Sequence, residues 1–228
     1  MKEMKDYRES QSKYLLLLLL FLFILWCTPL VDSLRTVEED GSTSYQVLAV
    51  TLESAVVSGT ISLAAFLCDN ILGGELKMRM VCLFLFPAPG ETVFSRLKDG
   101  KIHDKRFLTQ DALKVYEKIL NDLPRDVIKA RNYENAEWYR LYVGQQDKAS
   151  VVQTHRDFLT CRDLFSQTAV YILFYLLAIA VFPEVVSVSS RFVCLLLAIA
   201  ALTNLAAQIR MRRFVNTVLA VDIAQRNP

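Results

Sequence analysis

The chain has 228 residues, of which 53% are hydrophobic and 22% charged, and its formal net charge is only +2. The hydrophobic residues are concentrated in long uncharged runs, which excludes an ordinary soluble domain and favours membrane spans joined by charged segments. Because the charges nearly balance, the composition gives no reason to expect direct nucleic-acid binding.

Four apolar runs are long enough for transmembrane helices, and they cover residues 14–31, 47–72, 164–182 and 192–209. The last two are joined by the short segment 183–191 and are expected to form an antiparallel hairpin. The first run could also be a signal peptide, because it follows a charged start. We expect a retained anchor, since Cys27-Thr28-Pro29-Leu30 offers no small-residue cleavage pattern.

The positions of lysine and arginine predict the orientation in the bilayer. The N-terminal tail 1–13 holds four of them, whereas the loop 32–46 and the turn 183–191 hold one each. The C-terminal tail 210–228 again begins with three arginines within four residues. By the positive-inside rule, both tails and the segment 73–163 face the cytoplasm.

The segment 73–163 is expected to form a small, mostly helical cytoplasmic domain between the second and third spans. Its apolar stretch 78–86 fits either a short buried strand or a membrane-surface helix, because periodicity cannot separate the two. Helical spacing predicts further helices over 109–123, over about 133–142, and from about 147 onward. Thr109 is the expected N-cap of the first. The last should continue unbroken into span three, because no glycine or proline interrupts 148–182. The fold class is therefore mainly α, with four transmembrane helices.

Polar residues inside the second and fourth spans form a candidate intramembrane stripe, whose members are Glu53, Ser54, Ser58, Ser62 and Asn204. The serines recur every four residues, and Ala55 and Gly59 add a small-xxx-small spacing that lets another helix approach closely. The stripe fits tight packing in a bundle or an oligomer, with Glu53 protonated or hydrogen-bonded. It also fits a wet path between subunits, and Glu53 alone could simply extend to the interface.

An aromatic segment in the middle domain is a candidate partner surface, together with a polar pair further along the chain. The residues are Trp138, Tyr139, Arg140, Tyr142, His155 and Arg156. Aromatic residues beside arginine are typical of protein-binding hot spots. The same cluster also fits a base-stacking surface, or the core of a small domain with an aromatic anchor at the membrane interface.

The chain contains no convincing catalytic or metal-binding motif. Its five cysteines are dispersed without CxxC or Cys/His spacing, so neither zinc nor a disulfide framework is expected. His155-Arg156-Asp157 matches three letters of a kinase catalytic loop but lacks the accompanying motifs. Arg96 and His103 have the spacing of the Arg-x4–6-His motif of HEPN ribonucleases, but a turn is expected between them. We expect a protein that is not an enzyme and has no cofactor.

The order of several motifs resembles that of small four-span bacterial membrane proteins. The motifs are Lys77-Met78-Arg79, Pro89-Gly90, Trp138 to Tyr142, His155 to Leu159, Arg162-Asp163 and Arg213-Phe214-Val215. In build, the chain resembles the membrane component of the Kiwa system and the membrane accessory proteins of type VI-B CRISPR loci. The resemblance implies a non-enzymatic, oligomeric component of anti-phage defence with a cytoplasmic protein partner encoded nearby. The alternatives are a constitutive small channel or transporter, and a membrane-tethered ribonuclease.

Overall fold

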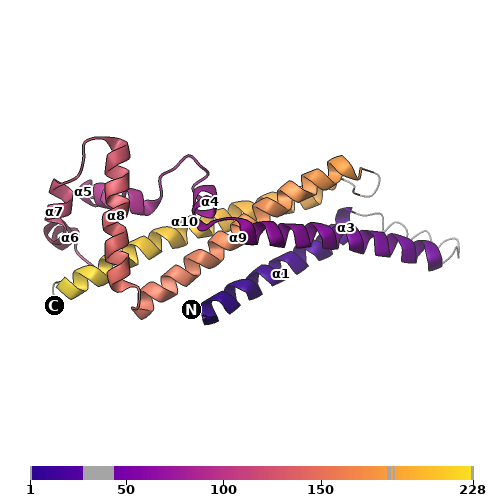
Figure 1. Ribbon diagram of the computed structural model, residues 1–228, viewed down its shortest axis with the longest axis horizontal. Helices are drawn as coiled ribbons and strands as arrows, with labels where there is room; N and C mark the ends of the chain where they lie inside the picture. Colours follow the sequence, from indigo (N-terminus) through magenta and orange to yellow (C-terminus); the bar gives the residue numbers. More distant parts are fainter. Residues whose placement is uncertain (1, 28–43, 184–185, 187, 227–228) are drawn as a thin grey trace. The chain divides into compact units, whose positions relative to one another are not determined.

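The computed structural model describes residues 2–27, 44–183, 186 and 188–226, and every regular element in that part of the chain is helical (Figure 1). The helices are α1 (Lys2–Cys27), α3 (Ser44–Ile71), α4 (Gly74–Val81), the 3-10 helix η1 (Pro89–Glu91), α5 (Val93–Lys98), α6 (Thr109–Val115), α7 (Glu117–Asn121), α8 (Val127–Gln145), α9 (Ala149–Val181) and α10 (Ser190–Arg226). The predicted mainly α class is confirmed.

Three of the helices are long and apolar enough to cross a membrane, namely Tyr45–Ile71, Ala149–Val181 and Ser190–Arg226. They correspond to the second, third and fourth predicted spans. The apolar part of α1, Gln11–Cys27, is shorter. The end of the first predicted run and the loop after it fall on residues 28–43, outside the described residues. A membrane protein is therefore supported by three helices, and the first predicted span, which begins in α1, stays a prediction.

The chain divides into two compact units, and three helices, α4, α9 and α10, contribute to both. The first unit comprises Met1–Lys77 and Arg162–Leu205, and the second comprises Met78–Cys161 and Ala206–Pro228. The expected continuity of α9 is confirmed, since this helix runs without a break from Ala149 to Val181. The final segment, expected as a separate tail, is instead helical to Arg226 and belongs to the second unit.

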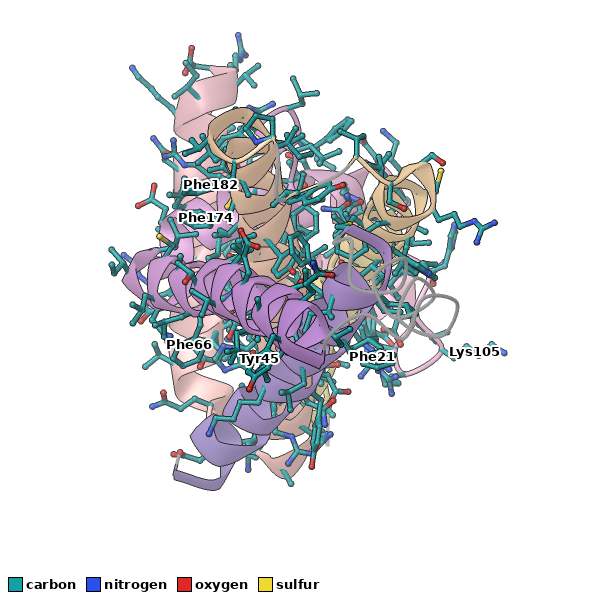
Figure 2. The ribbon with its side chains drawn as sticks, turned by 90° about the vertical axis from the view of Figure 1, so that its right-hand side faces the viewer. Phe21, Tyr45, Phe66, Lys105, Phe174 and Phe182 are labelled. Atoms are coloured by element: carbon teal, nitrogen blue, oxygen red, sulfur yellow. The ribbon has the colours of Figure 1, made fainter. Side chains whose placement is uncertain are left out.

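Aromatic side chains from three helices form the core of the first unit. Phe23 of α1 lies edge-on to Tyr175 of α9 and to Phe192 of α10, with ring centroids 5.9 Å apart in both pairs. Large apolar side chains such as Phe21 of α1 and Tyr45 of α3, labelled in Figure 2, are exposed on the outside of the first unit. Helices that are apolar on both their inner and outer faces are typical of a bundle in lipid.

The second unit is closed by contacts between segments far apart in the sequence. Glu134 of α8 accepts hydrogen bonds from the backbone N–H groups of Phe94, at 2.7 Å, and Ser95, at 3.0 Å. These donors lie in the first turn of α5, where backbone N–H groups have no partner within the helix. Tyr116 donates to Asp222 of α10 over 2.9 Å. Burial and the Asp222 carboxylate raise the pKa of Tyr116, so the phenol stays protonated as the donor.

The segment 78–86 forms neither the expected strand nor a continuous surface helix. Helix α4 ends at Val81, and a turn follows in which Leu83 and Phe84 adopt positive φ angles of 53° and 56°. The side chains from Leu83 to Phe86 are all exposed. The buried-strand prediction was wrong because the left-handed backbone at two successive residues breaks any extended pairing.

The single helix expected over 109–123 is interrupted. It forms α6 and α7 with a break at Tyr116, whose φ and ψ are −103° and 15°. The N-cap of α6 is Leu108 rather than Thr109, and no side chain caps this end. Helix α8 begins earlier than expected, because Asp126 caps it by accepting from the backbone N–H of Lys129 at 2.9 Å.

Candidate functional site

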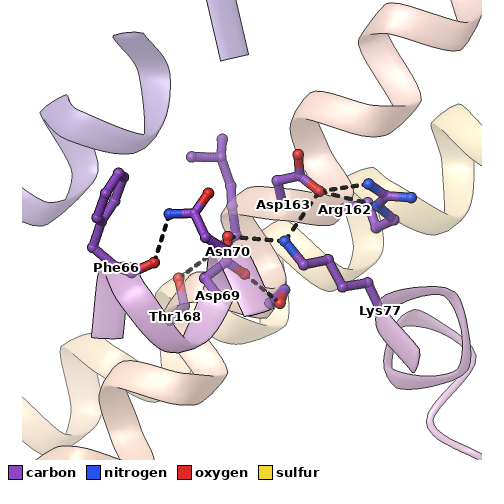
Figure 3. A network of polar contacts seen from close by, with 9 residues as sticks. Phe66, Asp69, Asn70, Lys77, Arg162, Asp163 and Thr168 are labelled. Carbon is purple, nitrogen blue, oxygen red and sulfur yellow. Dashed lines mark hydrogen bonds and ion pairs between the residues drawn. The ribbon is translucent and has the colours of Figure 1, made fainter. Parts of the chain in front are cut away.

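A buried network of charged side chains joins three helices of the first unit (Figure 3). The ammonium group of Lys77 on α4 lies 2.9 Å from Oδ2 of Asp69 on α3 and 3.8 Å from Oδ1 of Asp163 on α9. Arg162 also pairs with Asp163 at 2.8 Å, and Ser166 donates to Oδ1 of Asp69 at 2.6 Å. Two cations therefore face two carboxylates.

The network is almost entirely removed from solvent, since the side chains of Lys77, Asp69 and Asp163 are each less than one-tenth exposed. Losing one partner of a buried ion pair costs about 3–5 kcal/mol, because an uncompensated charge remains behind. Sequence analysis named Lys77 only as part of the Lys77-Met78-Arg79 motif and did not identify this network. The sequence feature that could have predicted the network is a pair of carboxylates, Asp69 and Asp163, at the ends of apolar runs near basic residues.

The serines of the predicted stripe face the interior of the first unit. Ser54 and Ser58 are buried and Ser62 is half-buried. The Ser58 hydroxyl donates to the carbonyl of Ser54 at 2.6 Å, within the same helix. Such a bond satisfies the Ser58 hydroxyl locally, so Ser58 serves close helix packing without needing a partner across the interface.

Glu53 does not share that inward face. It is exposed on α3 beside the buried Ser54, and it makes no hydrogen bond or ion pair with another described residue. Asn204 of α10, the fifth member of the stripe, is buried. The structure therefore separates the predicted stripe into an inward polar part and one outward carboxylate.

A polar residue that sequence analysis missed lies deep in the first unit. Gln167 of α9 is fully buried, and neither its amide nitrogen nor its amide oxygen has a partner among the described residues. The fully buried Tyr171 follows one helical turn later. A buried amide without partners costs several kcal/mol in an apolar medium, which makes a bound water or ligand group favourable there.

The predicted partner surface is mostly packed inside the second unit. Trp138 and Tyr142 stack at 5.8 Å between ring centroids, and His155 stacks on Phe214 of α10 at 4.7 Å. Phe214 also meets the edges of Trp138 and Tyr142, at 5.5 Å each. Burial raises the pKa of Tyr142, whose hydroxyl lies 3.3 Å from Nδ1 of His155. These four rings hold α8, α9 and α10 together.

Only part of the predicted surface points outward. Tyr139 is 57% exposed on α8, and the neighbouring Arg140 is also exposed and pairs with Glu137 at 2.6 Å. Arg156 is half-buried. Tyr139 and Arg140 are thus the members of the set that another molecule can reach.

Gly90 explains how η1 approaches the aromatic cluster so closely. A Cβ atom at this position would lie 3.2 Å from Cε3 of Trp138 and 3.2 Å from Oδ1 of Asn135. A larger residue here would force the Trp138 or Asn135 side chain to shift by a few tenths of an ångström. Sequence analysis named the Pro89-Gly90 pair as one of the resembling motifs, but the packing of Gly90 against Trp138 could not be predicted from it.

Arg96 and His103 do not lie on one helix, as the ribonuclease motif requires. Helix α5 ends at Lys98, and Gly100 turns the chain with a φ of +67° before His103 is reached. Among the described residues, no group of three or more histidine, cysteine, aspartate or glutamate side chains has a metal-binding arrangement.

Three groups therefore stand out: the ion network around Lys77, the unpartnered amide of Gln167, and the outward pair Tyr139 and Arg140. The function is therefore proposed from the residues of this chain alone. Comparison with known proteins finds no matching family model, no similar curated sequence and no similar solved structure.

Proposed function

We propose that this chain is a non-enzymatic component of a bacterial inner membrane that receives a protein partner in anti-phage defence. In this proposal it crosses the bilayer four times, with both termini and the second unit in the cytoplasm, and it forms a homo-oligomer. The partner is a cytoplasmic protein encoded nearby.

The observation that carries the proposal is the exposed pair Tyr139 and Arg140 on a helix whose opposite side is held by stacked rings. The stack of Trp138 on Tyr142 fixes the orientation of α8 within its unit. Tyrosine and arginine are enriched among residues that dominate binding energy. Val143, one turn beyond Tyr139, adds an exposed apolar side chain to the same surface.

Two features support the membrane topology. The described apolar part of α1 buries Leu16, Leu19 and Phe23 in the first unit while leaving Leu17 and Phe21 exposed, as expected for a fourth span facing lipid. The excess of basic residues in the N-terminal and C-terminal segments favours the cytoplasmic side for both.

The test is plaque formation on cells that express the chain with its neighbouring genes. The double substitution Tyr139→Ala with Arg140→Ala should lower protection at least tenfold, because truncating hot-spot residues costs more than about 2 kcal/mol of binding energy. The matched control is Lys114→Ala with Lys118→Ala, two exposed residues on α6 and α7. Full protection by the double variant would contradict the partner surface, and no protection by the wild type would contradict the defence role.

The second candidate function is a small channel, and the buried Gln167 amide without described partners favours it. A wet path through the first unit would supply the missing hydrogen-bond partners. Purified chain in liposomes should then pass ions without any partner, and Gln167→Leu should abolish the flux. A voltage-sensitive dye in cells, read before and after phage challenge, separates a constitutive channel from one opened by infection.

A further inference from the structure

A cavity of about 320 Å³ lies in the second unit, between the turn that follows α4, the segment η1–α5 and helix α10. Two arginines line it, Arg96 from the last turn of α5 and Arg212 from α10. Thr92 contributes a hydroxyl group, while Phe86 and Met211 contribute apolar wall. Its volume is at the lower end of the range for small-molecule sites, about 300–1,000 Å³.

Neither arginine has a partner in the described part of the chain. The guanidinium groups of Arg96 and Arg212 form no ion pair or hydrogen bond with any residue there, although Arg96 is half-buried. Two other arginines of the same unit are neutralised: Arg106 pairs with Asp104 at 2.7 Å and Arg210 with Asp157 at 3.1 Å. Arg96 is half-buried and Arg212 is exposed, and the two side chains line the same cavity.

The two cations repel each other when no counter-ion lies between them. Burial lowers the pKa of Arg96, and the charge of Arg212, which lines the same cavity, lowers it further. The acidic residue nearest in sequence to this wall, Glu91, accepts a hydrogen bond from the backbone N–H of Ala88 at 3.3 Å and does not line the cavity. An anion between the arginines would remove the repulsion.

We propose that this cavity binds a phosphate-bearing anion between Arg96 and Arg212, with the hydroxyl of Thr92 as a further hydrogen-bond donor. The planar fork of a guanidinium group matches two phosphate oxygens at once, and two such forks suit a phosphate better than a carboxylate. This site lies on residues other than the Tyr139–Arg140 pair, so the proposal is independent of the proposed partner surface.

The phosphate can belong to a phospholipid headgroup or to free phosphate, and the apolar turn beside the cavity favours the lipid. Phe86 lines the cavity and ends the exposed stretch Leu83–Phe86, in which Leu85 is 80% exposed. An acyl chain against these side chains would cover apolar surface that water now meets, at about 25 cal/mol per Å².

The experiment uses the full chain purified in detergent. Native mass spectrometry measures retention of phosphatidylglycerol, with phosphatidylcholine as the zwitterionic comparison, and calorimetry measures binding of inorganic phosphate. The variants are Arg96→Gln and Arg212→Gln. Arg131→Gln, an exposed arginine on α8 outside the cavity, is the matched control. Arg96→Lys keeps the charge without the fork, so it tests the site even if the glutamine variant is unstable.

We expect the wild type and the Arg131 variant to retain phosphatidylglycerol in preference to phosphatidylcholine. Each glutamine variant should bind it about tenfold more weakly, and Arg96→Lys should lie between. Binding of inorganic phosphate alone, lost in the same variants, supports the site with free phosphate as its ligand. The proposal is overturned if both glutamine variants bind phosphatidylglycerol and inorganic phosphate as tightly as the wild type does. It is also overturned if the wild type binds neither of them.

Discussion

Lys77 is the central residue of the buried ion network, because its ammonium group serves two carboxylates from helices far apart in sequence. Asp69 and Asp163 are separated by 94 positions, and each is within 4 Å of the same nitrogen atom, at 2.9 and 3.8 Å. At this scale a single side chain decides whether two buried charges are compensated.

Replacing Lys77 by methionine should strongly destabilise the first unit. The change keeps most of the apolar stem of the side chain but leaves Asp69 without its cation, at a cost of about 3–5 kcal/mol. Thermal unfolding in detergent measures the loss. The matched control is Lys101→Met, whose partner Asp99 lies 2.7 Å away in an exposed pair, and it should cost less than about 1 kcal/mol. Equal stability of the two variants would contradict a structural role for the network.

Asp104 should give the second unit a dependence on acid pH. Hydrogen bonds from Arg106 hold the pKa of Asp104 below its ordinary value of 3.8. The charged form is therefore favoured in the folded state, so its stabilisation is present above about pH 4 and is lost as the pH falls through the lowered pKa.

Unfolding at pH 6, 4 and 3, compared between wild type and Asp104→Asn, isolates this effect. At pH 6 the free energy of unfolding of the wild type should exceed that of Asp104→Asn by less than about 1 kcal/mol, because the Arg106 side chain is 42% exposed and solvent screens the pair. This difference should shrink at pH 3. A constant difference at all three pH values would show that the carboxylate charge is not responsible.

Helix α3 presents two different faces at the scale of one element. Its inward face carries Ser54 and Ser58 against the rest of the first unit, whereas its outward face carries Leu52, Val56 and Glu53. A lone carboxylate on a surface that faces lipid is unfavourable by a few kcal/mol near the bilayer centre. A second copy of the chain against this face would shield it.

Glu53→Leu should therefore insert normally but weaken the homo-oligomer, if the outward carboxylate forms hydrogen bonds between copies. Cross-linking in membranes, followed by sizing in detergent, measures the fraction of oligomer. Thr60→Val, another exposed polar residue on α3 whose hydroxyl already bonds to the carbonyl of Val56 at 2.8 Å, is the control. An unchanged oligomer in the Glu53 variant would remove this carboxylate from the interface.

The second unit constrains the topology of the whole molecule. Residues 78–161 and 206–226 pack into one unit, so they must lie on the same side of a membrane. That requires an even number of crossings between them, which α9 and α10 supply. Whether α1 also crosses decides on which side of the membrane the unit lies relative to the N-terminus.

Reporter fusions should distinguish four spans from three. With four, alkaline phosphatase fused after Asp40 or Pro183 is active outside the cytoplasm, and phosphatase fused after Gln110 or at the C-terminus is inactive. A fluorescent protein at the C-terminus should give the complementary signal. If α1 does not cross and the N-terminus is in the cytoplasm, the Asp40 fusion should be inactive and the Gln110 fusion active.

The sequence by itself determined the helical class, the three long candidate spans and the unbroken course of α9, because run length, composition and the absence of glycine and proline are local properties. It did not determine which sides of those helices face inward, since helices apolar all round give no rotational signal. Only the tertiary structure therefore separated Glu53 from the serines. It also packed Trp138 against Tyr142 and Phe214.

Tertiary packing also decided the long-range pairings. The end of α10 joins the second unit through Phe214 and Asp222, and Lys77 meets Asp163, because these contacts depend on how separate helices are rotated and brought together. A sequence records the charge of such residues but not their partner. Pairing is fixed by packing and by the need to compensate every buried charge.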